Sequence, residues 1–121
     1  MTFEGHVVRL AKAGVYPLLA GSMGEAIHLS HDERQVLIKA ARRALDKEGL
    51  KNVPVIAGTG AGSTRETLLL CREAADAGAD YVIVIMSGYF AGALANDRKA
   101  LKAFFVEVSG KSPLPVIIYN C

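Results

Sequence analysis

Small polar residues follow four short apolar runs of this sequence, and they are the residue types best suited to chemistry. The four sets are Gly-Ser-Met-Gly-Glu at 21–25, Gly-Thr-Gly-Ala-Gly-Ser-Thr at 58–64, Ser-Gly-Tyr-Phe at 87–90 and Tyr-Asn at 119–120. Backbone N–H groups of glycine-rich turns bind carboxylates, and side-chain hydroxyls pass protons. The four sets therefore indicate carboxylate binding and proton transfer, provided that the fold brings them to one place.

Each of these residues also has an ordinary structural explanation. Ser22 between glycines is typical of a turn, and Tyr89 is typical of a surface or interface residue. Tyr119 at a strand end fits a core tyrosine whose hydroxyl reaches outward. The glycines of residues 58–62 either cradle a phosphate or let the chain turn; this segment has Ser at position 63, which breaks the G-x-G-x-x-G spacing, and it lacks the P-loop lysine.

The four sets contain neither a cluster of metal-binding residues nor a lysine that could form a Schiff base. The histidines are isolated in sequence, and two cysteines are too few for a zinc site or a disulfide framework. A Schiff base needs a desolvated lysine in the pocket, and no lysine follows any of the four short apolar runs. We therefore expect no metal site and no Schiff base from these residues. The residues concerned are His6, His28, His31, Cys71, Cys121, Lys12, Lys39, Lys47, Lys51, Lys99, Lys102 and Lys111.

Four helix-and-strand units position these sets. Apolar residues recur with helical spacing in four stretches, and each stretch is followed by a glycine and a short apolar run. The expected helices include residues 7–11, 37–44, 67–74 and 101–108; the glycines are Gly14, Gly49, Gly78 and Gly110; the expected strands are 15–20, 53–57, 81–86 and 115–119. Ser30-x-x-Glu33 and Ser63-x-x-Glu66 are typical capping boxes, and Asn96 or Asp97 begins a further helix.

The strands predict an α/β fold with a parallel sheet. Residues 81–86 are apolar throughout, so we expect helices to bury both faces of the strand. Two architectures remain, a doubly wound sheet and a (β/α)₈ barrel, which needs roughly 250 residues. Four strands in 121 residues have two bare edges and fit a part of the larger fold, within a single domain at 1–121.

Composition excludes several classes of protein. Half of the residues are apolar, too many for a disordered chain, yet the longest apolar run is far shorter than the roughly 20 residues that cross a membrane. The N-terminus does not resemble a signal peptide. A net charge of +2 with both signs mixed argues against nucleic-acid binding. We expect a reducing, cytoplasmic location, with the mitochondrion as the alternative.

Five motifs together resemble the dihydrodipicolinate synthase / N-acetylneuraminate lyase family, which includes 4-hydroxy-2-oxoglutarate aldolase. The motifs are AGSMGEA at 20–26, LSxxE at 29–33, VIAGTG at 55–60, AGAD at 77–80 and PVIIYN at 115–120, and they cover essentially the whole chain in the family's order. The resemblance implies a (β/α)₈ barrel of which this chain holds strands two to five. It also implies aldol cleavage or condensation through a pyruvate Schiff base, without a metal or cofactor.

The resemblance assigns roles to individual residues. The Ser22 hydroxyl would relay protons, and backbone N–H groups around Gly21, Ser22 and Met23 would hold the pyruvate carboxylate. Tyr119 would shuttle the proton beside the Schiff base. Tyr89 would reach into a neighbouring subunit of a homo-oligomer. The other substrate would be a small aldehyde or 2-oxo acid.

Departures from the family pattern limit what the chain does alone. Met23 stands where Thr or Asn is usual, Gly88-Tyr89-Phe90 replaces Pro-Tyr-Tyr, and Gly62 stands where Asn is common. The Schiff-base lysine of the family lies on strand six, so we expect little or no turnover from these 121 residues. Two alternatives remain: a non-catalytic half-barrel that associates with itself or with a full-length relative, and a small nucleotide binder using Gly58–Gly62.

Overall fold

Helices and strands alternate along the chain. The structure is a computed structural model that describes residues 1–94 and 96–120, so Cys121 lies outside it. Within this part of the chain, no helix has both the length and the hydropathy needed to cross a membrane. The elements are α1 (Phe3–Lys12), β1 (Leu18–Leu19), the 3₁₀ turn η1 (Ala26–His28), α2 (His31–Lys47), β2 (Ile56–Gly58), α3 (Thr64–Ala77), β3 (Tyr81–Ile85), α4 (Ala91–Leu94), α5 (Arg98–Lys111) and β4 (Val116–Tyr119).

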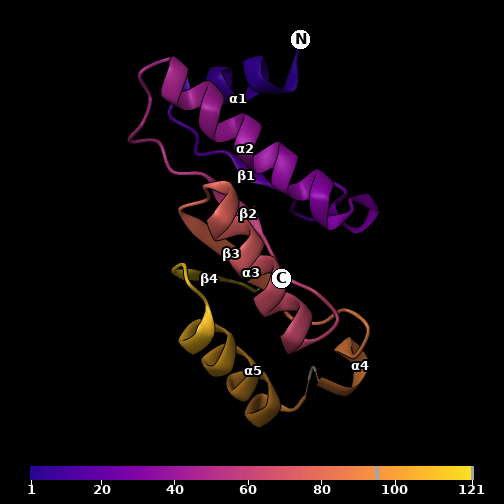
Figure 1. Cartoon of the computed structure of the whole chain (residues 1–121). Coiled ribbons are helices and arrows are strands. Elements are labelled where there is room, and N and C mark those ends of the chain that lie inside the picture. The colour runs from indigo at the N-terminus through magenta and orange to yellow at the C-terminus, as the bar shows by residue number, and fades with distance from the viewer. Residues whose placement is uncertain (95, 121) are drawn as a thin grey trace.

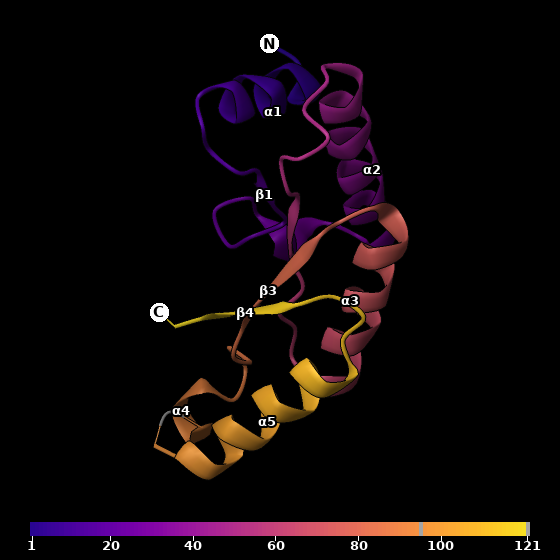
Figure 2. The ribbon, with the colours of Figure 1, turned by 90° about the vertical axis from the view of Figure 1, so that its left-hand side faces the viewer.

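The four strands form one parallel sheet in the order β1-β2-β3-β4, so each strand pairs with the one before it in sequence. Helices α1, α2, α3 and α5 follow one another along the sheet, each packed against the next (Figures 1 and 2). A doubly wound sheet reverses its strand order and has helices on both faces. Sequential order with a single helical layer is instead the arrangement of a (β/α)₈ barrel, of which this chain forms a part.

Only one face of the sheet is covered, and the expectation that both faces are buried was wrong. Val82 and Val84 of β3 are fully buried under the helices, whereas Tyr81 on the other face of the same strand is 40% exposed. Ile117 of β4, on the same open face, is 37% exposed. The apolar run does not alternate because both faces are built for burial, but this chain supplies helices for one face only.

Helix starts follow the predicted signals, with one difference. Ser30 and Glu33 form the complete capping box that begins α2, and Asp97 caps α5 by accepting from the N–H of Ala100 at 2.9 Å. Ser63 also caps α3 by accepting from the Glu66 N–H at 3.2 Å. The Glu66 carboxylate does not return to Ser63, so this capping box is incomplete.

Helix ends follow the predicted glycines except at α5. Gly78 ends α3 with a left-handed backbone, at φ of 102°. Gly110, by contrast, lies inside α5, which runs on to Lys111. Pro113 explains the difference, because a proline disfavours helical backbone in the residue before it. Ser112 is accordingly extended, with φ of −69° and ψ of 136°, and the helix stops there.

Candidate active-site rim

The four polar sets lie along one rim of the sheet, where the parallel strands all end. Ser22 follows β1, Thr59 follows β2, Tyr89 follows β3, and Tyr119 is the last residue of β4. Because β2 and β3 separate β1 from β4, Ser22 and Tyr119 lie at opposite ends of this rim. Among the described residues, no hydrogen bond joins Ser22, Tyr89 or Tyr119 to one another. The fold therefore places them on the same edge without assembling them into a contacting cluster.

The loop after β1 has two successive backbone N–H groups without a hydrogen-bond partner in the described residues. Its own turn is closed by the N–H groups of Gly24 and Glu25, which donate to the carbonyls of Gly21 and Ser22 at 3.0 and 3.1 Å. Within the described part of the chain, the N–H groups of Ser22 and Met23 have no hydrogen-bond acceptor, and both side chains are exposed. Two unpaired donors at successive positions are available to a carboxylate.

Backbone strain brackets the same loop. Ala20 just before it has φ of 52°, and Glu25 at its far end has φ of 54°. Residues other than glycine rarely adopt this left-handed backbone conformation, and they keep it only where surrounding contacts stabilise it. Gly58 lies against Ala20, and Arg34 binds the carbonyl of Ala26, the residue after Glu25.

Gly58 lets β2 approach the loop more closely than any other residue would. A Cβ atom at position 58 would lie 2.1 Å from the carbonyl oxygen of Ala20, which is far inside van der Waals contact. Of the glycines at residues 58–62, for which both phosphate binding and a simple turn were open, Gly58 is thus required for the close packing of β2 on the loop. The backbone of the strained turn at Ala20 occupies the space that a side chain at position 58 would need.

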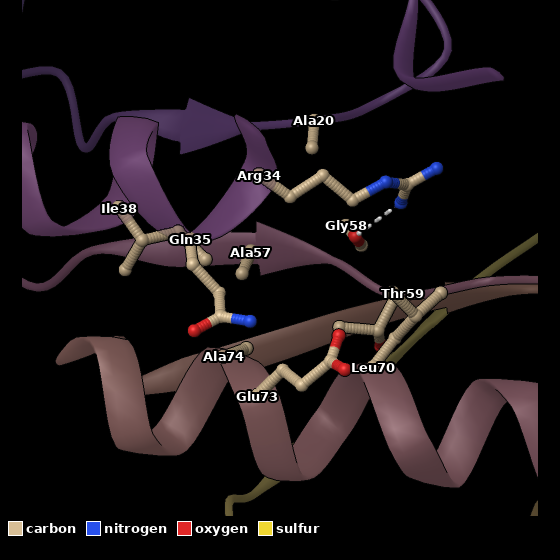
Figure 3. Close-up of a pocket in the computed structure, with 10 residues that line it drawn as sticks. All are labelled: Ala20, Arg34, Gln35, Ile38, Ala57, Gly58, Thr59, Leu70, Glu73 and Ala74. Carbon is tan, nitrogen blue, oxygen red and sulfur yellow. Dashed lines mark hydrogen bonds between the residues drawn. The ribbon is translucent and has the colours of Figure 1, made fainter. Parts of the chain in front are cut away.

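Arg34 of α2 ties the loop to the sheet, and sequence reasoning missed it. Its guanidinium donates to the carbonyl of Ala26 at 2.6 Å and to the carbonyl of Gly58 at 3.4 Å (Figure 3). Burial lowers the pKa of Arg34, while the charges of Glu66 and Glu73 act in the opposite direction. Figure 3 shows the Arg34 guanidinium beside Gly58, and Arg34, Ala20 and Gly58 line one small cavity of about 10 Å³. No motif marks this arginine in the sequence.

The remaining hydroxyls of the rim serve the fold. Thr59 is buried, and its Oγ1 lies 3.4 Å from the Cys71 thiol while its N–H donates to the carbonyl of Ile83. Ser87 is also buried and donates to the carbonyl of Gly62 at 3.2 Å. Ser22 and Tyr119, by contrast, are exposed, and within the described residues their side chains make no hydrogen bond.

Tyr89 stands apart from the other rim residues. Its side chain is 87% exposed, and its ring packs edge-on against Phe90 with 4.9 Å between the ring centroids. Both rings belong to the segment between β3 and the short helix α4. Two exposed aromatic rings in contact form an apolar projection of the kind found at protein interfaces.

The sequence suggested that His31 is isolated, but in the structure it is not. It bridges α2 and α3, with Nδ1 2.7 Å from the Glu73 carboxylate and Nε2 2.7 Å from the Glu66 carboxylate. These hydrogen bonds, first to Glu73 and then to Glu66, raise the pKa of His31. They also explain why the Glu66 carboxylate does not complete the capping box at Ser63. In the described residues no group of three His, Cys, Asp or Glu side chains is arranged to hold a metal ion.

The His31 bridge predicts a fall in stability as the pH rises. A histidine whose folded-state pKa is raised contributes its full stabilisation below the unfolded value of about 6.5 and loses it as the pH passes the folded value. We expect the urea midpoint of unfolding to fall between pH 6 and pH 8, and the variant His31→Gln to remove this part of the pH dependence. His28→Gln is the matched control, since His28 is exposed and bonded to neither carboxylate. Equal slopes for the wild-type chain and His31→Gln would contradict the prediction.

Residues 8–121 match the model of the dihydrodipicolinate synthetase family. The chain belongs to this family. Its relatives include a protein of Emericella nidulans named "Probable 4-hydroxy-2-oxoglutarate aldolase, mitochondrial", 48% identical over 98% of this chain and 38% of that protein. Another is the L-threo-3-deoxy-hexylosonate aldolase of Aspergillus niger, 46% identical over 98% of this chain and 36% of the relative.

Solved structures of the family share the fold. The dihydrodipicolinate synthase of Acinetobacter baumannii, crystallised with pyruvate, superposes with a TM-score of 0.84 at 32% identity, over 98% of this chain and 38% of that one. The chain thus spans little more than a third of the dihydrodipicolinate synthetase family members that it matches. The uncovered face of its sheet is the face that lines the inside of a closed barrel.

Proposed function

We propose that these residues belong to a pyruvate-dependent lyase that makes or breaks a carbon–carbon bond of the aldol type. The observation that carries the proposal is the loop after β1, where the N–H groups of Ser22 and Met23 are unpaired at the strand ends of a lyase-family barrel. Pyruvate supplies the carboxylate for these donors. A small aldehyde or 2-oxo acid is the second substrate, as for a 4-hydroxy-2-oxoglutarate aldolase or a dihydrodipicolinate synthase.

In this proposal the two hydroxyls handle protons. Ser22 sits beside the bound carboxylate and relays protons, and Tyr119 delivers a proton from the far end of the rim. Met23 carries no hydrogen-bonding group where the family usually has Thr or Asn, so the substrate is held with one side-chain bond fewer. Tyr89 is proposed to reach the site of a neighbouring subunit in a homo-oligomer, which its exposure allows. No metal or cofactor takes part.

Covalent catalysis depends on a residue outside the rim of this chain. Every lysine of the sequence lies on a helix or ahead of a strand, including Lys111 at the end of α5 and Lys51 before β2. In the family the Schiff-base lysine is on strand six. We therefore propose that the parent activity needs a complete barrel and that these 121 residues alone do not turn over substrate.

Borohydride trapping tests the lysine argument. We expect the chain, incubated with pyruvate and borohydride, to keep its unmodified intact mass, because no amine lies at the strand ends to form the imine. A chimera in which residues 1–121 replace the equivalent part of an active relative should gain one trapped pyruvate. An adduct on any lysine of the 121-residue chain would contradict the first expectation, and a chimera that folds but binds no pyruvate would contradict the proposed function.

A second candidate function is a non-catalytic half-barrel that associates with itself or with a full-length relative. The exposed side chains on the open face of the sheet favour it, because exposed strands and apolar surfaces seek partners. For location we propose the cytoplasm, with the mitochondrion as the alternative that the name of the Emericella nidulans relative suggests.

A further inference from the structure

The chain exposes more surface than a compact protein of its size. A folded monomer of 12.8 kDa is expected to expose about 6,300 Å². The structure exposes 7533 Å², an excess of roughly 1,200 Å². Two chains that each hide such an area would bury more than 2,000 Å² together, which is the range of permanent dimers.

Part of the exposed apolar surface lies on the open face and at the two edges of the sheet. Strand register places alternate residues on the open face, and four of them are more than a third exposed. Both edge strands, β1 and β4, have an unpaired side along which another parallel strand fits. The four exposed residues of the open face are Leu18, Tyr81, Ile117 and Tyr119.

The two edges complement each other in the helical layer as well. Helix α1 packs on α2, at the end of the layer opposite α5, and so extends the layer at the β1 end of the sheet (Figures 1 and 2). At the other edge the situation is reversed, because Ile118 of β4 faces the helical side with Val84 yet is 57% exposed. One edge has a helix beyond its last strand, and at the other edge α5 covers β4 only in part.

We propose that two copies of this chain, related by a two-fold axis, close an eight-stranded parallel barrel. Strand β4 of each copy pairs with β1 of the other, and α1 of each copy covers Ile118 of its partner. Both junctions are then identical, no strand edge remains free, and each strand has one helix. A (β/α)₈ barrel has eight strands, and two copies of this four-stranded sheet together supply eight. The pairing rests on the second candidate function and does not depend on the lyase chemistry.

Size-exclusion chromatography with light scattering tests the pairing. We expect the wild-type chain to have twice its 12.8 kDa mass. The variants Leu18→Asp on β1 and Ile118→Asp on β4 should each halve that mass, because both edges take part in both junctions. Each residue is already exposed in the single copy, so the substitution costs the fold little. Val36→Asp is the matched control, since Val36 is 64% exposed on α2, a helix that packs between α1 and α3 away from either edge.

Each other outcome overturns the barrel in its own way. A wild-type monomer would remove both the barrel and self-association. A dimer that Ile118→Asp breaks and Leu18→Asp does not would mean that β4 pairs with β4, which keeps self-association and excludes closure. Open-ended oligomers would show that the junction forms but does not close. If either variant loses its helical circular dichroism, the wild-type chain provides a second test. Its melting midpoint should rise with protein concentration, and an unchanged midpoint would refute the dimer.

Discussion

Replacing Gly58 with alanine is expected to abolish the folded state or to destabilise it by more than about 3 kcal/mol. The new methyl group would lie 2.1 Å from the carbonyl oxygen of Ala20. That oxygen belongs to the backbone, so no side chain can rotate away to make room. Relief would require β1 and β2 to separate or the strained turn at Ala20 to open. Urea denaturation followed by circular dichroism measures the loss.

Gly62→Ala is the matched control in the same loop. No atom lies within 4 Å of a Cβ at position 62, and its φ lies outside the left-handed region. This substitution should leave the free energy of unfolding within about 0.5 kcal/mol of the wild-type value, as expected for an open surface position. If the two variants were equally stable, the close approach of Gly58 to Ala20 would not exist in solution.

Removing the hydroxyl of Tyr119 should have the largest effect on turnover. In the chimera with a complete barrel, Tyr119→Phe is expected to lower kcat by about a hundredfold or more, the usual contribution of a positioned proton donor. The phenyl ring remains, so the packing of β4 is preserved. Pyruvate trapping by borohydride should persist, since the carboxylate site after β1 lies at the other end of the rim.

Tyr16→Phe provides the comparison for Tyr119→Phe. Tyr16 loses the same hydroxyl but lies ahead of β1, at the end of the sheet opposite the rim, and is 60% exposed. Its kcat should be that of the unmodified chimera. A Tyr119→Phe chimera with unchanged kcat would leave Tyr119 as a strand residue without a role in proton transfer.

Much of the fold could be predicted because local signals and tertiary structure agree. The spacing of apolar residues in α2 and α3 places their buried side chains on one face, and Ser30 and Asp97 begin helices where their side chains can accept from free N–H groups. The position of Ser22 and Tyr119 on one rim also follows from sequence, because parallel strands end on the same side. The roles assigned to these residues stay predictions.

Features that depend on distant residues could not be predicted. Glu66 has the correct spacing to complete a capping box, yet its carboxylate binds His31, which lies 35 positions earlier in the sequence. Arg34 looks like any helical arginine until the fold brings the carbonyls of Ala26 and Gly58 to it. An apolar strand such as β3 indicates that both faces are meant for burial, but the sequence of the strand does not say which segment or chain covers the second face.

The sequential pairing of the strands has a consequence for biosynthesis. Each strand needs only the unit made just before it, so β2 can pair with β1, and α2 can cover them, while α3 is still being translated. Folding can then keep pace with the ribosome, because every pairing joins neighbouring units and none waits for a distant part of the chain. Within these residues β4 is the last strand to pair, and its outer edge stays open until another strand is available.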